Sequence, residues 1–204
     1  MDGTLYLDGE ERFGSATSRF YAVSRLIPTM RHFYSFVLND LSSLEFLTIL
    51  DIGTGDGYEL VSLAEAKNGF IGYGIDPSPQ MVKVARRRAA KRRVESRIKF
   101  DIGSSRNIPG GENFDIIYSS LSFHHWKERE AALAGIMSRL NEGGSFIIYE
   151  TSDDGTFNRK FVKSHLMNRN EFEQIAPRNS LELKRISENG GFIAAEFGVS
   201  KRTA

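Results

Sequence analysis

The stretch ILDIGTGDG at residues 49–57, followed by GYGID at residues 72–76, decides the fold. Its apolar start predicts a buried strand, and its closely spaced glycines predict a sharp turn whose backbone N–H groups can approach a ligand. Asp76 ends the second segment about twenty positions after Gly55. That spacing suits a carboxylate that accepts hydrogen bonds from ribose hydroxyls in a βαβ nucleotide-binding unit.

Length and composition bound the organisation of the chain. Its 204 residues, 40% of them hydrophobic, can bury one sizeable core, and 27 basic against 26 acidic residues argue against a chain built around a polyanion. The absence of cysteine excludes a disulfide framework and thiolate metal sites, and the four scattered histidines suggest no zinc site, so no metal is expected. The N-terminus lacks a signal-peptide pattern and no run approaches the roughly 20 apolar residues of a membrane span, so we expect a cytoplasmic protein.

Strand and helix patterns alternate after residue 45. They predict strands at residues 46–52, 70–75, 98–102, 115–119 and 145–150, and helices at residues 58–66, 79–94 and 129–140. Ser78 is a candidate N-cap with Pro79 in the first turn, and residues 141–144 are a candidate stop and turn. Alternation of this kind predicts an α/β fold with a doubly wound, mostly parallel, Rossmann-like sheet of six or seven strands.

The N-terminal part of the chain has a different pattern. Residues 1–44 show no strand signal but a helical one, so we expect an N-terminal helical extension that packs over the sheet. Residues 45–204 would then form the main domain.

Four motifs carry a family resemblance. In chain order they are DIGTGDG at residues 51–57, IDPSPQM at 75–81, FDIIYSSLSFHHW at 114–126 and LNEGG at 140–144. Their order and spacing resemble those of class I S-adenosylmethionine-dependent methyltransferases, and most closely the small-molecule subgroup that includes the ubiquinone and menaquinone C-methyltransferases. The resemblance implies S-adenosylmethionine as the cofactor, and methyl transfer by in-line displacement to a small-molecule acceptor.

The resemblance also implies a role for each matched position. Asp51 would face the ammonium group of the cofactor, and Asp76 would hold its ribose. The other cofactor-binding positions it implies are Gly53, Thr54 and Gly55 beside the methionine part, Pro77 and Met81 at the adenine, and Ser119, Ser120 and Leu121 at the end of the fourth strand.

One position departs from the family pattern. A Gly-Asp pair six residues before a proline usually places a carboxylate at the adenine amine, whereas the register from Pro109 back to Gly103 puts Ser104 there. A hydroxyl can still accept a hydrogen bond from the amine, but without charge assistance. Adenine orientation would then depend more on the Ser105 backbone and on apolar packing.

Two histidines follow the fourth predicted strand, at the edge of the sheet where ligands bind. His124 or His125 is a candidate general base for an activated carbon or hydroxyl acceptor. The alternative is structural, with one imidazole packed beside Trp126 and the other in a solvated turn. The structural alternative is favoured because a histidine near a site is not thereby a base.

Other functions were weighed against this one. A dinucleotide fingerprint would place its third glycine where Tyr58 stands, and Asp51 and Asp56 put acidic charge where a pyrophosphate would lie, which argues against a dehydrogenase. Residues 83–97 carry eight basic residues against Glu95 alone, and the near-neutral total favours a solvated helix face over a nucleic-acid surface. A non-catalytic cofactor-binding regulatory or scaffold module, and an RNA methyltransferase that uses this helix, stay open.

The two ends of the chain give further expectations. By analogy with the family, Phe20 or Tyr21 is a candidate lid residue, although core packing is the commoner role of such aromatics. Short helices are predicted at residues 157–167, 170–175 and 180–188, followed by a strand at residues 192–199. Since the family usually ends in an antiparallel pair of strands, the last strand is expected to be missing, very short or supplied by a partner, which would favour a homodimer.

Overall fold

The computed structural model describes residues 27–154, 166–178 and 181–199. Phe20 and Tyr21, the candidate lid residues, lie outside these ranges. The helices are α2 (Pro28–Ser43), α3 (Tyr58–Ala66), α4 (Pro79–Arg92), α5 (Arg129–Met137) and α7 (Arg169–Arg178), with a short 3₁₀ turn η2 (Phe123–His125). The strands are β1 (Thr48–Ile52), β2 (Ile71–Asp76), β3 (Ile98–Ile102), β4 (Phe114–Ser120), β5 (Leu140–Ser152), β6 (Leu166–Met167), β7 (Leu181–Asn189) and β8 (Phe192–Val199).

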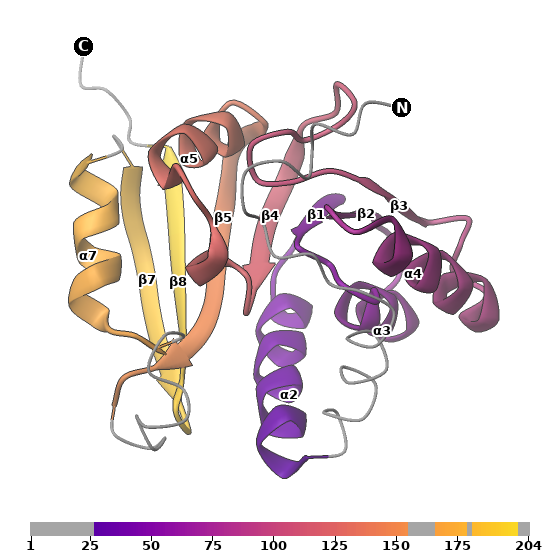
Figure 1. Ribbon diagram of the computed structural model, residues 1–204, viewed down its shortest axis with the longest axis horizontal. Coiled ribbons are helices and arrows are strands. Elements are labelled where there is room, and N and C mark those ends of the chain that lie inside the picture. Colours follow the sequence, from indigo (N-terminus) through magenta and orange to yellow (C-terminus); the bar gives the residue numbers. More distant parts are fainter. Residues whose placement is uncertain (1–26, 155–165, 179–180, 200–204) are drawn as a thin grey trace.

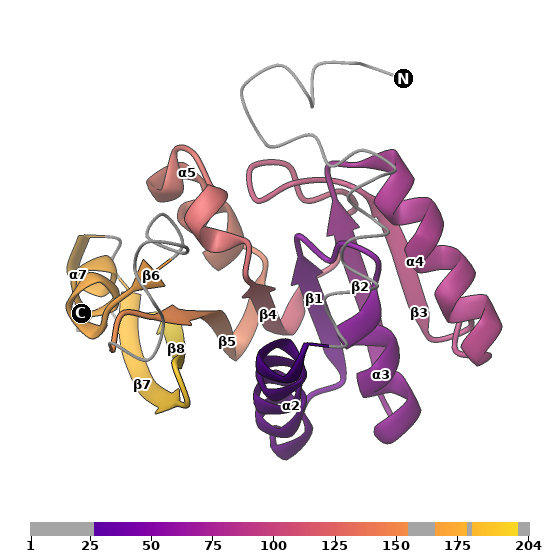
Figure 2. The ribbon, with the colours of Figure 1, turned by 60° about the horizontal axis from the view of Figure 1, so that its bottom comes forward.

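These strands form one sheet with the order β3-β2-β1-β4-β5-β8-β7, and the two-residue β6 pairs with β5 (Figure 1). Strands β1 to β5 are parallel, whereas β8 is antiparallel to both β5 and β7. Figure 2 shows β3 and β7 at opposite ends of the sheet. This confirms the α/β fold with a doubly wound, mostly parallel, Rossmann-like sheet. Within the described residues the sheet has eight strands where six or seven were predicted, because neither the two-residue β6 nor β7 was foreseen as a strand.

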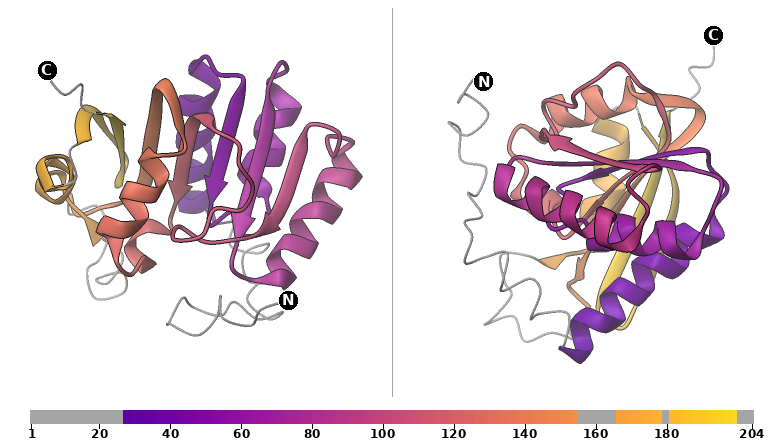
Figure 3. Two further views of the ribbon diagram at one scale, coloured as in Figure 1. Left: turned by 90° about the horizontal axis from the view of Figure 1, so that it is seen from above. Right: turned by 90° about the vertical axis from the view of Figure 1, so that its right-hand side faces the viewer.

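Helices cover both faces of the sheet (Figure 3). One core cluster joins α2, α3 and α4 to side chains such as Ile49, and the other joins α5 and α7 to side chains such as Leu50. The side chains of successive β1 residues are therefore buried on opposite faces of the sheet, as expected for a strand between two helical layers. The strand order reverses between β1 and β4, so the connections that leave the carboxyl ends of these two neighbouring strands run in opposite directions and leave room for a ligand.

The first half of the domain agrees closely with the sequence-based elements. Strands β1 to β4 begin and end within two residues of their predicted bounds, and α3 matches its range. Ser78 caps α4, where its hydroxyl accepts a hydrogen bond from the Met81 N–H at 3.4 Å, and Pro79 occupies the first turn.

The predicted stop and turn at residues 141–144 is wrong. Strand β5 already begins at Leu140, and α5 ends at Met137, three residues before its predicted end. Gly143 has φ of 77°, and the β4–β5 register shifts between Phe114 and Ile116, so the glycines form an irregularity at the start of the strand.

The predicted helix at residues 180–188 is also wrong. This segment is β7, which pairs with β8 in an antiparallel hairpin closed by Gly190 and Gly191, both with positive φ. A register shift between Leu183 and Arg185 interrupts the alternation of apolar side chains along β7, which hid the strand from a periodicity argument. The last strand is therefore present within the chain, and the argument that its absence favours a homodimer no longer holds.

The remaining C-terminal predictions have mixed outcomes. The predicted helix at residues 170–175 lies inside α7. Of the segment 157–167, residues 157–165 lie outside the described ranges, and Leu166–Met167 is the strand β6. Among the described helices, none has the length and apolar character needed to cross a membrane.

Candidate functional site

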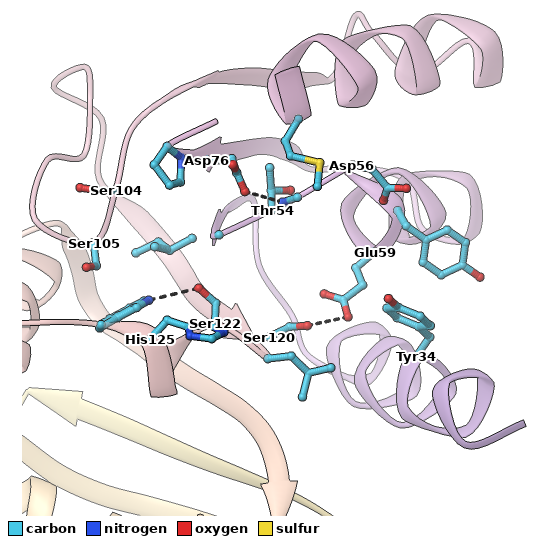
Figure 4. A pocket seen from close by; sticks show the side chains of 18 residues that line it. Tyr34, Thr54, Asp56, Glu59, Asp76, Ser104, Ser105, Ser120, Ser122 and His125 are labelled. Carbon is cyan, nitrogen blue, oxygen red and sulfur yellow. Dashed lines mark hydrogen bonds between the residues drawn. The ribbon is translucent and has the colours of Figure 1, made fainter. Parts of the chain in front are cut away.

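A pocket opens at the carboxyl ends of β1, β2 and β4 (Figure 4). It encloses about 970 Å³ of space, its open mouth included, which suits a cofactor-sized ligand. Of the site residues predicted from the sequence, those that line it are Gly53, Thr54, Gly55, Asp76, Pro77, Met81, Ser104, Ser105, Ser120, Leu121 and His125. Asp51, Ser119 and His124 are not among its lining residues.

The glycine loop after β1 is tied to the end of β2. The N–H groups of Gly53 and Thr54 both donate to the carbonyl of Ile75 at 2.9 Å. Gly53 has φ of 82°, and a Cβ there would lie 2.8 Å from the Cβ of Ser122, so only glycine fits this close approach. At Gly53 the loop therefore brings its backbone directly against Ser122.

Asp76 is held rigidly beside this loop. Its Oδ2 accepts a hydrogen bond from the Gly55 N–H and its Oδ1 accepts one from the Ser78 N–H, both at 2.9 Å. The side chain is almost fully buried yet lines the pocket. Hydrogen bonds from backbone N–H groups stabilise the ionised carboxylate and fix its direction.

Asp51 lies behind the loop, out of the pocket lining. Its Oδ2 accepts a hydrogen bond from the Thr54 hydroxyl at 2.7 Å. Burial raises the pKa of Asp51 to about 7, against the lowering effect of that hydroxyl. Asp51 thus supports Thr54, which does line the pocket.

The loop between β3 and β4 forms the wall next to Asp76. Ser104 and Asn107 exchange two backbone hydrogen bonds of 3.1 Å, and the Gly103 N–H donates to the Asp76 carbonyl. A Cβ on Gly103 would lie 2.7 Å from the ring of Pro109. Ser104 and Ser105 are both largely buried here, and both line the pocket.

The end of β4 forms the opposite wall. Because neighbouring residues of a strand point to opposite faces, Ser120 lines the pocket and Ser119 is buried away from it. Leu121 follows with φ of 46°, and its N–H donates to the Tyr149 carbonyl at 2.9 Å.

The two neighbouring histidines have different surroundings in the structure. His124 is turned to Glu150, which is fully buried: its Nδ1 lies 2.8 Å from Oε2, and its backbone N–H donates to Oε1 at 3.1 Å. His125 lines the pocket, and the two imidazole centroids are 3.9 Å apart. The pair therefore consists of one anchored ring and one ring exposed to the ligand space.

Sequence reasoning missed two carboxylates that line the pocket, Asp56 and Glu59. Glu59, in the first turn of α3, is buried, and its Oε1 accepts a hydrogen bond from the Ser120 hydroxyl at 2.7 Å. Burial, with the neighbouring Asp51 as a second cause, raises the pKa of Glu59 to about 8. Its place one turn after the glycine loop was the available signal.

Sequence reasoning also missed several further lining residues. Tyr34 comes from α2 and Tyr58 from α3, and their rings meet edge to face with centroids 4.9 Å apart. No local sequence pattern connects two positions on separate helices. The others are Ile52, Ser122 and Trp126.

The chain is similar in sequence to known methyltransferases. The profile of a methyltransferase-domain family matches residues 45–191, which include most of the pocket. The ubiquinone biosynthesis O-methyltransferase of Paramagnetospirillum magneticum is 32% identical over 126 residues, which are 60% of this chain and 49% of that protein. The erythromycin 3''-O-methyltransferase of Saccharopolyspora erythraea is 32% identical over 101 residues, which are 49% of this chain and 33% of that protein. The chain thus spans between a third and a half of the length of these two relatives.

A solved structure supports the fold. The TehB-like SAM-dependent methyltransferase from Corynebacterium glutamicum superimposes with a TM-score of 0.66 at 21% identity, covering 91% of this chain and all of that one. At this identity the likeness concerns the fold alone.

Proposed function

Because the chain belongs to the methyltransferase-domain family, whose class I members use S-adenosylmethionine, we propose that it methylates a small-molecule acceptor by in-line displacement. The observation that carries the proposal is the shape of the pocket. Its lining continues from Asp76 past Leu121 to His125 and Trp126, so a cofactor and an acceptor can lie side by side in one open pocket.

The residues of the pocket fit the cofactor. Asp76 offers oriented carboxylate oxygens to ribose hydroxyls, and a Cβ on Gly55 would meet no atom within 4 Å, so the loop leaves open space at the ligand. We place the adenine against Pro77 and Met81, with Ser104 and Ser105 at its edge. Bound S-adenosylmethionine supplies a methyl group on a positively charged sulfur.

For a displacement of this kind the protein mainly aligns the reactants and excludes water. The buried loop at Gly53 and the rigid Asp76 fix one partner, and the wall formed by Leu121 and Trp126 shields the other. His125 is the side chain that we assign to proton acceptance from a hydroxyl or amine acceptor. His124, bound to Glu150, would hold the segment that carries it.

Names of relatives support a small acceptor. The two curated relatives described above are named for O-methylation in erythromycin and ubiquinone biosynthesis, and a third, from Rauvolfia serpentina, is named ajmaline N-methyltransferase. These names describe the relatives. They suggest that hydroxyl and amine compounds are the acceptors to test with this protein.

The test is turnover with such a panel. Purified protein with methyl-labelled S-adenosylmethionine should label at least one phenol, quinol, sugar hydroxyl or amine, and His125→Asn should lower the rate by about 10² without weakening cofactor binding. His32→Asn is the matched control, since His32 lies outside the pocket lining against Phe192. A protein that binds the cofactor but labels nothing in the panel or in a metabolite extract would instead be a non-catalytic module.

A further inference from the structure

Glu59 is the buried carboxylate that methyl transfer, as described above, does not use. One oxygen, Oε1, is held by the Ser120 hydroxyl, and the other, Oε2, makes no hydrogen bond within the described residues. The side chain is more than nine-tenths buried, yet it lines the pocket, so the second oxygen faces ligand space. The oxygens of a carboxylate on a largely buried side chain are normally satisfied by partners.

Aromatic rings stand beside this carboxylate. Figure 4 shows Glu59 between Ser120 and Tyr34. Tyr58 packs edge to face against Tyr34. A carboxylate next to aromatic rings is the environment that proteins use to bind cations, because the ring faces carry negative potential.

The described lining residues offer no basic side chain to the oxygen Oε2 of Glu59. Among the described residues that line the pocket there is no lysine or arginine. The Arg88 guanidinium lies over the Tyr58 ring, 5.6 Å from the ring centroid, and pairs with Asp56 at 2.6 Å, and Arg88 itself is not a lining residue of the pocket. Within the described part of the chain, the positive charge that would pair with Oε2 is left to a ligand.

Folding alone gives no reason to keep a carboxyl group here. Burial and the nearby Asp51 raise the pKa of Glu59, so its charged form is disfavoured until a cation arrives. A glutamine would keep the hydrogen bond to Ser120 without this penalty.

We propose that Tyr34, Tyr58 and Glu59 form a subsite for a primary ammonium group of a bound ligand. The ammonium group donates a hydrogen bond to Oε2 of Glu59 and lies against the tyrosine rings. This inference rests on the proposed function, because two ligands of the reaction can carry such a group. One is the amino-acid part of the cofactor, and the other is an amine acceptor.

Calorimetry with Glu59→Gln separates the two sources. The probes are S-adenosylmethionine, S-adenosylhomocysteine and 5′-methylthioadenosine, the last of which keeps the adenosine but lacks the ammonium group. If the cofactor supplies the ammonium, the variant binds the first two about tenfold or more weakly and 5′-methylthioadenosine as well as before.

If the acceptor supplies it, the variant binds all three nucleosides normally. The contribution of the ammonium group is then measured in the complex with S-adenosylhomocysteine. There, phenethylamine should bind the unmodified protein about tenfold more tightly than 2-phenylethanol does. Glu59→Gln should abolish this preference. Tyr34→Leu should weaken the same ligand severalfold, because it removes one ring of the subsite.

Glu65→Gln is the matched control. It lies on the same helix, α3, but outside the pocket lining, where Glu65 pairs with Arg92. It should bind every probe like the unmodified protein.

Two results would overturn the subsite. One is a folded Glu59→Gln protein that binds both cofactor forms normally while the unmodified protein shows no preference for the amine. The other is an equal loss of affinity for 5′-methylthioadenosine, which would mean that Glu59 only shapes the pocket. Failure of the unmodified protein to bind any of the nucleosides would refute the proposed function instead.

Discussion

The carboxylates around the pocket differ because their surroundings differ. Asp76 accepts two backbone hydrogen bonds of 2.9 Å, which favour its ionised form. Burial is the main cause that raises the pKa of Asp51 to about 7 and that of Glu59 to about 8, and the charge of a neighbouring aspartate adds to it, Asp76 for Asp51 and Asp51 for Glu59. Carboxyl groups of one chemical kind therefore differ here: Asp76 is held by backbone donors, whereas burial disfavours the charged forms of Asp51 and Glu59.

The raised pKa of Glu59 predicts a pH-dependent stability difference in the ligand-free protein. Between its ordinary value of 4.5 and about 8, Glu59 keeps its proton in the folded state and loses it in the unfolded chain. The unfolded state then binds fewer protons, so Glu59 lowers the stability as the pH rises through this window. Glu59→Gln lacks this effect.

Thermal unfolding at pH 5 and pH 8 measures this effect of Glu59 on the stability. The melting temperature of Glu59→Gln relative to the unmodified protein should rise by a few degrees between the two values, since about 1 kcal/mol corresponds to roughly 2–4 °C in a chain of this size. An equal difference at both pH values would contradict the assigned burial of the charge.

His124 is expected to act on the structure and not on the acceptor. His124→Asn withdraws the ring from Oε2 of the fully buried Glu150, which should reduce the stability by about 1–3 kcal/mol. Any loss of turnover should accompany this loss, because the same segment carries Leu121. A variant with unchanged melting and cofactor affinity but abolished methyl transfer would show instead that His124 is the base.

At the scale of elements, α4 carries most of the basic run and uses much of it within the domain. Arg86 donates two hydrogen bonds to the Phe100 carbonyl, and Arg88 and Arg92 pair with Asp56 and Glu65. Contacts of this kind anchor the helix to its neighbours. They also reduce the charge offered to a polyanion.

We therefore expect α4 to be a solvated face and not an RNA-binding surface. Fluorescence anisotropy with a structured RNA should show weak binding that disappears as the salt is raised to physiological strength, since phosphate contacts fall steeply with salt. Tight binding at that salt, lost when Arg87, Lys91 and Arg92 are changed to glutamine, would indicate that the methyl acceptor is RNA.

Elements differed in how well their sequence predicted them. Strands β1 and β2 were predictable because apolar runs end in glycines or Asp76, which mark both strand and site. Strand β7 was not, because polar side chains and an irregular register mask its alternation. Tyr34 and Glu59 escaped for a related reason, since only the packing of α2 against α3 brings them to one pocket.

At the scale of the whole molecule, Asp40 links the helix α2, early in the chain, to the strands β5 and β7. This α2 residue accepts hydrogen bonds from both terminal nitrogens of Arg185 on β7, at 2.7 and 2.9 Å, and from the Tyr149 hydroxyl at 2.7 Å. The network fixes α2 against the sheet and thereby holds Tyr34 at the pocket.

Breaking this network should loosen α2. Arg185→Ala should lower the stability by about 1–3 kcal/mol, because it leaves the largely buried Asp40 with one side-chain donor among the described residues. Cofactor affinity should fall with it if α2 covers the site. Arg169→Ala is the control, since Arg169 makes an exposed pair with Glu188, and it should melt within about 0.5 kcal/mol of the unmodified protein. Equal melting of the two variants would contradict the role of Asp40.

The central claim is that the pocket binds S-adenosylmethionine through Asp76, and titration calorimetry tests it most directly. Asp76→Ala removes charge-assisted hydrogen bonds worth about 1.5–3 kcal/mol, so the affinity should fall by roughly ten- to a hundredfold. Asp101→Ala, at an exposed carboxylate near the end of β3, should leave it unchanged. A folded Asp76→Ala protein that binds S-adenosylmethionine as tightly as the unmodified chain would contradict the account.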